Sequence, residues 1–321
     1  MDAVKKIIDV SGWHQSAMSV GGGTRDKLVF RRTKFGKVYY MVKGHQKDVG
    51  ELRAEVCASN LGRIIGFPVQ QARFCIIPDY EALGFSDQRG VLIRLDITRQ
   101  KDPRRNIFKE DLLHGMDIIA LYDPAFQALP DERTRRSEYK LSKVVYSLRN
   151  FIRQNPSAKT LWYSFYELMV FDALIGGTDR HYRNWGVLVD SETRKYTRFA
   201  PAFDNGISLL WNTVHHKTFI NSAIDGHFVK KAKSAFRKDG GGQYSLFELC
   251  EELAKYPEIT SEIIDVVKEK VCLITDSKLK KALITYVPHS SEFETEKEIL
   301  AYLFEYVKMR LQILKELLNR L

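Results

Sequence analysis

The chain has 321 residues, and its 50 lysines and arginines against 40 aspartates and glutamates give a net charge of +10 at pH 7. With 44% hydrophobic and 28% charged residues, its composition excludes collagen-like, mucin-like and wholly disordered proteins. The length suits two domains or one bilobed unit, and no apolar run reaches the roughly eighteen residues that would cross a bilayer.

The first part of the chain is predicted to be rich in β-structure. Aromatic and β-branched residues on both sides of a short glycine-containing turn predict a hairpin over 27–32 and 37–43. A helix is predicted over 48–65, where apolar residues recur on one face, and Gly66 and Pro68 should end it. Further strands are predicted over 69–78 and 90–96. Residues 1–98 should therefore form a small lobe with one prominent helix.

Longer helical patterns dominate residues 99–321, which are predicted to form a second, larger lobe. The clearest patterns lie at 158–175, 245–255, 260–274 and 292–320. In the last of these, leucines from Leu300 to Leu321 advance by three or four residues and predict a face that packs in a core. The expected fold class is α+β, with a β-rich and a helical lobe.

Cysteine usage and the N-terminus suggest a reducing compartment. Cys57, Cys75, Cys250 and Cys272 form no CxxC pair, and their spacing suits neither a zinc site nor a disulfide scaffold. We therefore expect reduced thiols in the core. The N-terminus meets charge within two residues and lacks the apolar segment of a secretory signal, so we expect a soluble protein that does not use the general export route.

Three basic clusters account for much of the positive charge. None carries interleaved aromatic residues in the pattern of an RNA-binding sheet or lies in a helix-turn-helix pattern, so no obligatory nucleic-acid partner is predicted. The clusters are interpreted as solvated faces or as surfaces that dock acidic partners. They lie at 99–109, 133–136 and 230–238.

The stretch LIGGTDRHYRNW at 174–185, followed by FAPAFDNG at 199–206, carries the most chemical information. Phosphoryl transferases use residues of these types in this order to place a base and hold magnesium. The order is an aspartate, an asparagine five positions later and then an aspartate near a glycine. Asn184 and Asp204 offer the hard oxygen ligands that Mg²⁺ prefers. Asp179 is the candidate to accept the proton of an acceptor hydroxyl. Either acid alone would more often be a turn cap or a strand end.

A kinase needs further parts upstream, and residue types that fit them are present. Lys43 ends the second hairpin strand, and Glu55 on the next helix could orient it toward the phosphates of ATP, with Glu51 as a rival partner. Residues 92–96 are predicted to form the hinge between the lobes, and Asp96 there could accept from ribose hydroxyls. Three consecutive glycines ahead of the hairpin allow close backbone approach to phosphates: Gly21, Gly22 and Gly23.

These motifs resemble those of HipA-like serine/threonine kinases, over roughly residues 18–320. The resemblance rests on LIGGTDRHYRNWGVLV, FAPAFD and the SVGGGTRDK loop. It implies a bilobed protein-kinase-like fold, with Asp179 as the catalytic aspartate and Lys43 at the ATP phosphates. It also implies that Asn184 and Asp204 hold magnesium and that Asp96 contacts the ribose. His181 is expected either to support the catalytic loop by hydrogen bonding or to be an ordinary structural histidine.

Some features depart from the longer members of that family. Those members have an additional N-terminal subdomain that contacts an antitoxin, whereas 18 residues precede the SVGGGTRDK loop here, so antitoxin and operator binding are not expected. The size and pattern are similar to compact, secreted bacterial members. This implies action in the bacterial cytoplasm or, after export without a signal peptide, in host cells as an effector.

The predicted function is transfer of the γ-phosphoryl group of Mg-ATP to serine or threonine of a protein, including autophosphorylation. A phosphoinositide-type lipid kinase is one alternative, because Asp179-Arg180-His181-x-x-Asn184 also matches the catalytic loop of those enzymes. A nucleotide-dependent, non-catalytic toxin or adaptor is another. Residues 206–228 are predicted to form an activation or substrate-docking loop. The lysines just beyond it are expected to recruit acidic substrates: Lys230, Lys231 and Lys233.

Overall fold

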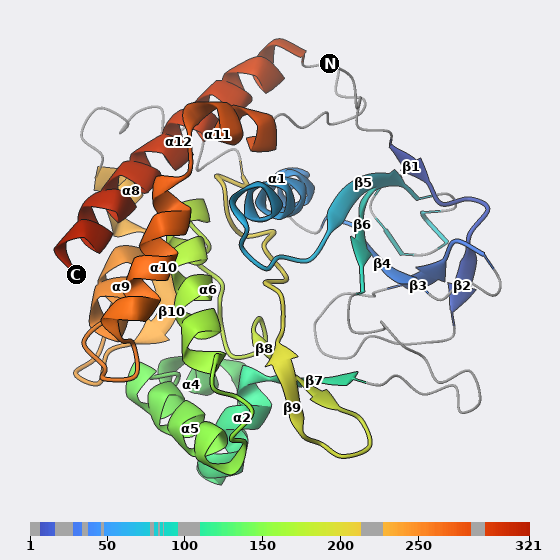
Figure 1. Ribbon diagram of the computed structural model, residues 1–321. Coiled ribbons are helices and arrows are strands. Elements are labelled where there is room, and N and C mark those ends of the chain that lie inside the picture. Colours follow the sequence, from blue (N-terminus) through green and yellow to red (C-terminus); the bar gives the residue numbers. More distant parts are fainter. Residues whose placement is uncertain are drawn as a thin grey trace.

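The computed structural model places a curled β-sheet on one side of the molecule and a helical assembly on the other, with helix α1 between them (Figure 1). The long C-terminal helix α12 runs along the outer edge of the helical assembly (Figure 1). The described residues are 7–16, 28–33, 38–45, 48–77, 80–82, 84–85, 87–95, 110–212, 227–283 and 293–321.

The N-terminal sheet has six strands in the order β1-β5-β6-β4-β3-β2. The predicted hairpin is confirmed, since β3 and β4 pair antiparallel with Leu28 opposite Val42. Side chains alternate between two faces, so Met41 and Ile93 pack toward α1 while Val42 and Leu92 pack on the opposite face. The strand bounds are Ile8–Asp9 (β1), His14–Ser16 (β2), Leu28–Arg31 (β3), Tyr39–Lys43 (β4), Ala72–Ile76 (β5) and Arg89–Arg94 (β6).

Helix α1 (Gly50–Ile65) is buried on two sides. Leu52 and Val56 pack against the sheet, whereas Cys57 and Leu61 belong to the core of the helical assembly. Gly66 ends the helix as predicted, in the left-handed conformation with φ of 79°, and donates its backbone N–H to Gly62 O. Because its two faces are apolar, α1 fixes the sheet relative to the helices.

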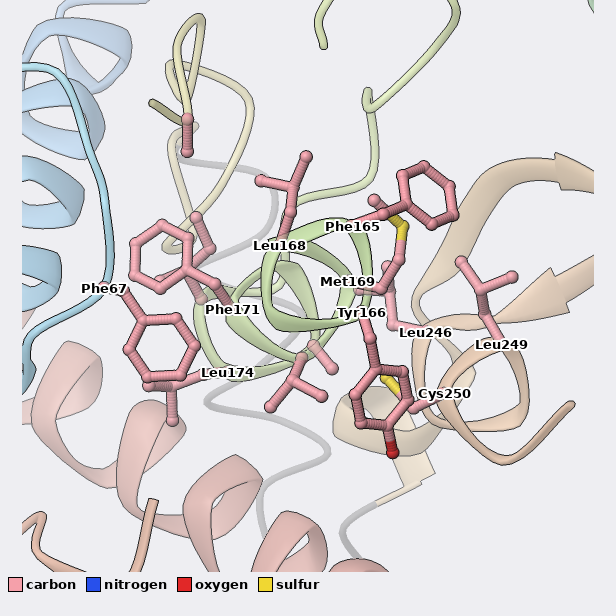
Figure 2. Close-up of a cluster of buried hydrophobic side chains, with 14 of the residues drawn as sticks. Phe67, Phe165, Tyr166, Leu168, Met169, Phe171, Leu174, Leu246, Leu249 and Cys250 are labelled. Carbon is pink, nitrogen blue, oxygen red and sulfur yellow. The ribbon is translucent and has the colours of Figure 1, made fainter. Parts of the chain in front are cut away.

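Helix α6 (Leu161–Ile175) forms the centre of the helical assembly. Thirteen of its 15 residues are buried, so it is apolar on all sides, as expected of a helix with no face to solvent. Figure 2 shows Phe171 and Leu174 on the side of Phe67, and Phe165, Tyr166 and Met169 on the side of Leu246, Leu249 and Cys250. This packing gives the chain that leaves the end of α6 a rigid starting point.

Helices α9, α10 and α12 pack against α6, and they confirm the patterns predicted for 245–255, 260–274 and 292–320. The bounds are Gly115–Tyr122 (α2), Pro124–Gln127 (α3), Glu132–Ser137 (α4), Leu141–Gln154 (α5), His227–Lys231 (α8), Leu246–Leu253 (α9), Ser261–Cys272 (α10), Asp276–Leu283 (α11) and Phe293–Arg320 (α12). The apolar face of α12 is buried at Leu303, Val307 and Leu314, but Leu321 at the end of the chain is 42% exposed. None of the described helices combines the length and apolarity that crossing a membrane requires.

The helical region also contains two small antiparallel sheets, β7-β8-β9 and β10-β11. Strand β7 was not predicted because its sequence, EDLLH, has no β-branched residue and no alternation. Strand β7 pairs with β8. Strand β8 follows α6 in the chain, after the loop 176–185. The bounds are Glu110–His114 (β7), Gly186–Asp190 (β8), Tyr196–Phe199 (β9), Lys233–Arg237 (β10) and Gln243–Ser245 (β11).

The four cysteines are free thiols, but they differ in exposure. Cys57, Cys75 and Cys250 are buried as predicted, whereas Cys272 is exposed at the end of α10, so the prediction of a core thiol is wrong there. Burial raises the pKa of Cys75 to about 12 and also raises the pKa of Cys250. Buried, protonated thiols react slowly with thiol reagents.

We therefore expect dithiobis(nitrobenzoic acid) to modify one thiol per native chain rapidly and the other three only after unfolding. Substitution Cys272→Ser should remove the rapid phase, measured by absorbance of the released thiolate. Rapid modification of more than one thiol in the native wild type would contradict this distribution.

Candidate active site

The loop between α6 and β8 carries most of the predicted catalytic residues. Helix α6 ends at Gly176, whose φ of 68° is left-handed and whose backbone N–H donates to Asp172 O. A Cβ at this position would lie 2.1 Å from Tyr306 Oη on α12, so both the backbone conformation and the packing require glycine here. The chain consequently turns sharply into 177–185.

Hydrogen bonds within this loop fix the predicted aspartate and asparagine relative to each other. The carbonyl oxygen of Asp179 accepts from the backbone N–H of His181 and from Asn184 Nδ2, both at 2.8 Å. The backbone N–H of Asn184 in turn donates to His181 O at 2.8 Å. The hydrogen bond to Asp179 therefore orients the side-chain amide of Asn184.

Arg180, which the sequence analysis left without a role, organises the base of the site. Its guanidinium is 4% exposed and forms a two-point ion pair with Asp172 on α6, with Nε–Oδ2 at 2.9 Å and Nη2–Oδ1 at 2.8 Å. It also donates to the carbonyl oxygens of Asn184 and Phe203 and to Asn205 Oδ1. One side chain therefore ties the catalytic loop to the segment that contains Asp204.

Both members of this ion pair are completely enclosed. Burial raises the pKa of Asp172, and the charge of Arg180 opposes that rise. Burial alone would lower the pKa of Arg180, but the adjacent Asp172 raises it above its ordinary value. In the sequence, Asp172 interrupts the apolar run from Leu168 to Ile175. A lone charged residue inside such a run is itself a sign of a buried partner, since an isolated charge there would be too costly.

Lys43 joins the N-terminal sheet to the helical part of the molecule. Its Nζ lies 2.6 Å from Glu55 Oε1 on α1 and 2.5 Å from Asp204 Oδ1, which is 161 residues away in sequence. The second oxygen of Glu55 accepts from the backbone N–H of Asn205 at 3.0 Å. Of the two glutamates considered from the sequence, Glu55 thus forms this bridge. Glu51 is buried one turn earlier on the same helix.

Asp204 has a backbone conformation that non-glycine residues seldom adopt. Its φ is 55°, in the left-handed region, and its side chain is 39% exposed. Strained conformations of this kind persist where the surrounding structure holds them, and they concentrate at functional sites. Here the neighbouring carbonyl of Phe203 and side chain of Asn205 are both held by Arg180. The carboxylate is therefore presented by a segment that is fixed on both sides.

The donor set suits a magnesium ion that also binds a phosphate. Asp204 supplies a carboxylate and Asn184 an amide oxygen, which are hard ligands of the kind Mg²⁺ takes. Among the described residues, no group of three histidine, cysteine, aspartate or glutamate side chains could hold a metal ion by itself. The remaining ligands would accordingly be waters and phosphate oxygens, as is usual for Mg²⁺ with nucleotides.

The carboxylate of Asp179 is 27% exposed and has two basic neighbours. Arg136 Nη1 on α4 lies 3.4 Å from Oδ1, and His181 Nε2 lies 3.8 Å from Oδ2. Burial lowers the pKa of His181, which favours the neutral ring, and its Nδ1 accepts from the backbone N–H of Arg183 at 3.2 Å. The sequence grouped Arg136 with a basic cluster, and nothing in the local pattern linked it to Asp179.

Other predicted residues lie outside the described part of the chain. These are Gly21, Gly22 and Gly23 of the glycine loop, Asp96 of the hinge and most of the predicted activation loop, 213–226. The start of that loop is described, and Leu209 there donates its backbone N–H to Ile175 O at the end of α6. The lysines beyond the loop are exposed: Lys230, Lys231 and Lys233.

Comparison with known proteins identifies a family and a fold. The profile of the HipA-like C-terminal domain matches residues 18–272. The crystal structure of a Helicobacter pylori proinflammatory kinase, CtkA, is similar with a TM-score of 0.73 and 19% identity, covering 98% of this chain and 100% of that one. A structure of the Shewanella oneidensis MR-1 toxin–antitoxin system, HipA and HipB with operator DNA, matches with a TM-score of 0.50 and 10% identity, covering 97% of this chain and 70% of that one. A search of curated proteins finds no match. At these identities the structural likenesses establish the fold, and they confirm the kinase-like α+β architecture expected from the sequence.

Proposed function

Because this chain belongs to the HipA-like C-terminal domain family, we propose that it transfers the γ-phosphoryl group of Mg-ATP to serine or threonine hydroxyls of a protein, itself included. The observation that carries the proposal is the buried Lys43, which bridges Glu55 of α1 and Asp204 of the helical part. A lysine held by a helix glutamate beside a metal-binding aspartate is the arrangement that protein kinases require for phosphate binding.

Each residue then has a role in the transfer. Lys43 contacts the phosphates of ATP, with Glu55 keeping its ammonium group in place. Asn184 and Asp204 would hold Mg²⁺, which when bound neutralises charge on the phosphates. Asp179 accepts the proton of the acceptor hydroxyl. The oxygen of that hydroxyl bonds to the γ-phosphorus while the bond between the γ-phosphorus and ADP breaks. Arg180 touches no reactant and acts by positioning Asn184 and Asp204.

The same proposal extends to parts of the chain whose placement is not described. We assign nucleotide binding to residues 1–98, with Gly21, Gly22 and Gly23 over the phosphates and Asp96 at the ribose, and acceptor binding to residues 99–321. We propose a protein substrate and no obligatory nucleic-acid partner. The proposed site of action is the bacterial cytoplasm or, after export, a host cell.

The test is transfer from γ-labelled ATP in magnesium buffer to dephosphorylated casein, to the chain itself and to phosphoinositide vesicles. Substitution Asp204→Ala should lower labelling of protein by roughly 10²–10³-fold, because loss of a metal-binding carboxylate removes several kcal/mol of transition-state stabilisation. Asp265→Ala, which removes an exposed aspartate on α10, is the control and should label as the wild type does.

The acceptor that takes the label distinguishes the proposal from its alternatives. Label on serine or threonine that is lost in Asp204→Ala supports the protein kinase. Label confined to lipid would replace it by a phosphoinositide-type kinase. ATP binding without label anywhere would replace it by a nucleotide-dependent toxin or adaptor that is not a catalyst.

A further inference from the structure

Helix α4 carries three arginines, and one of them, Arg136, reaches Asp179 of the predicted catalytic loop. The helix begins after Asp131, whose Oδ1 accepts from the backbone N–H of Thr134 at 2.8 Å, so its start is fixed. We propose that Arg136 on this helix binds a carboxylate next to the acceptor hydroxyl, and so makes acidic peptide segments the preferred substrates. This inference rests on the proposed function, because it takes Asp179 as the residue that the acceptor hydroxyl approaches.

The three arginines of α4 have different surroundings. Arg135 is turned toward the protein, with Nη2 donating to Leu129 O at 3.0 Å and Nη1 at 3.5 Å from Glu132 Oε2. Arg133 is exposed. Arg136 reaches the site, since its Nη1 is 3.4 Å from Asp179 Oδ1 and its Nε is 3.2 Å from Glu132 Oε1. One of the three is thus placed to meet a substrate.

An acceptor hydroxyl that approaches Asp179 must come within a few ångströms of the Arg136 guanidinium. His181, the other basic neighbour, lies farther away at 3.8 Å and is held by the backbone N–H of Arg183. The permanent positive charge beside the acceptor is therefore that of Arg136. A glutamate or aspartate flanking the acceptor would be attracted to it, and a lysine or arginine would be repelled.

The present contacts of Arg136 are weak enough to be exchanged. Its side chain is 48% exposed, Glu132 is 42% exposed, and the contacts are long for charge-assisted hydrogen bonds. A substrate carboxylate could offer two parallel N–H···O bonds, a geometry that guanidinium groups favour. Binding an acidic segment would also draw Arg136 away from the oxygen of Asp179 that must accept the proton.

Two serine peptides of equal length, with glutamate or with glutamine on both sides of the serine, test the inference with the full chain. For the wild type we expect kcat/KM to be about 3- to 10-fold higher for the glutamate peptide, mainly through KM. In Arg136→Gln this ratio should fall to about one because KM for the glutamate peptide rises. Arg136→Lys, which keeps the charge but loses the planar fork, should give an intermediate ratio.

Arg133→Gln is the matched control, because it removes an exposed arginine from the same helix, and it should keep the wild-type ratio. A ratio of one for the wild type, or a ratio unchanged in Arg136→Gln, would overturn the inference. So would an equal loss on both peptides, since Arg136 would then only position Asp179. A wild type that labels itself but neither peptide would overturn this inference and leave the kinase standing. No label on any protein would overturn both.

Discussion

Replacement of Asp179 by asparagine is expected to lower the rate of phosphoryl transfer by roughly 10²–10⁴-fold, the range that a general base contributes. Asparagine has the same shape but cannot take up the proton of an acceptor hydroxyl. The carbonyl oxygen of residue 179, which accepts from His181 N and Asn184 Nδ2, is unaffected by the substitution. The loop should therefore keep its conformation, and the loss should be one of chemistry.

Single-turnover labelling with saturating Mg-ATP measures this effect, and thermal unfolding with and without nucleotide shows whether binding survives. We expect Asp179→Asn to be stabilised by Mg-ATP as the wild type is, because Lys43, Asn184 and Asp204 remain. Asp265→Asn, an exposed aspartate changed in the same way, should be fully active. A rate for Asp179→Asn within a few-fold of the wild type would remove Asp179 from the role of proton acceptor.

Replacement of Asp172 by asparagine is expected to destabilise the protein by about 3–5 kcal/mol, the usual cost of leaving one member of a buried ion pair without its partner. Asp172 is 1% exposed and Arg180 4% exposed, so water cannot take over the lost contact. Activity should fall as well, because the Arg180 guanidinium also holds the carbonyls of Asn184 and Phe203. Urea unfolding followed by circular dichroism gives the change in free energy.

A surface ion pair of the same chemistry provides the control. Asp111 Oδ2 lies 2.5 Å from Arg194 Nη1, and the two side chains are 46% and 53% exposed. Because water can replace this contact, Asp111→Asn should change the free energy of unfolding by less than about 1 kcal/mol. The double variant Asp172→Leu/Arg180→Met should be more stable than Asp172→Asn yet inactive, since it removes the buried charge together with the hydrogen bonds to the segment of Asp204. Equal stability of Asp172→Asn and Asp111→Asn would show that the buried charge of Arg180 does not need Asp172 as its partner.

Local patterns in the sequence predicted the elements that have a strong period or a clear boundary. The β3–β4 hairpin and helix α1 with its Gly66 end belong to this group. Spacing also placed Asp179 and Asn184 in one loop, because residues five apart after a helix end have few ways to separate. The direct contact of Lys43 with Asp204 was not predicted, since it joins residues 161 positions apart.

What the sequence did not predict depends on contacts between distant segments. The pairing of Arg180 with Asp172 requires the loop to fold back on the end of α6, and a charged residue in an apolar run does not identify its partner. Arg136 reaches Asp179 from a six-residue helix that has no buried residue and hence no apolar pattern to orient it. Strand β7 is defined by its neighbour β8 more than by its own residues.

Helix α1 is shared between two hydrophobic cores, and this has a thermodynamic consequence. Leu52 and Val56 complete the interior of the sheet, while Ala58 and Leu61 complete the interior around α6. If the sheet came apart, α1 would lose one apolar contact surface, and the helical assembly would lose part of its own interior with it. The free energies of the two halves are therefore not additive, because each half stabilises the other through a single shared helix.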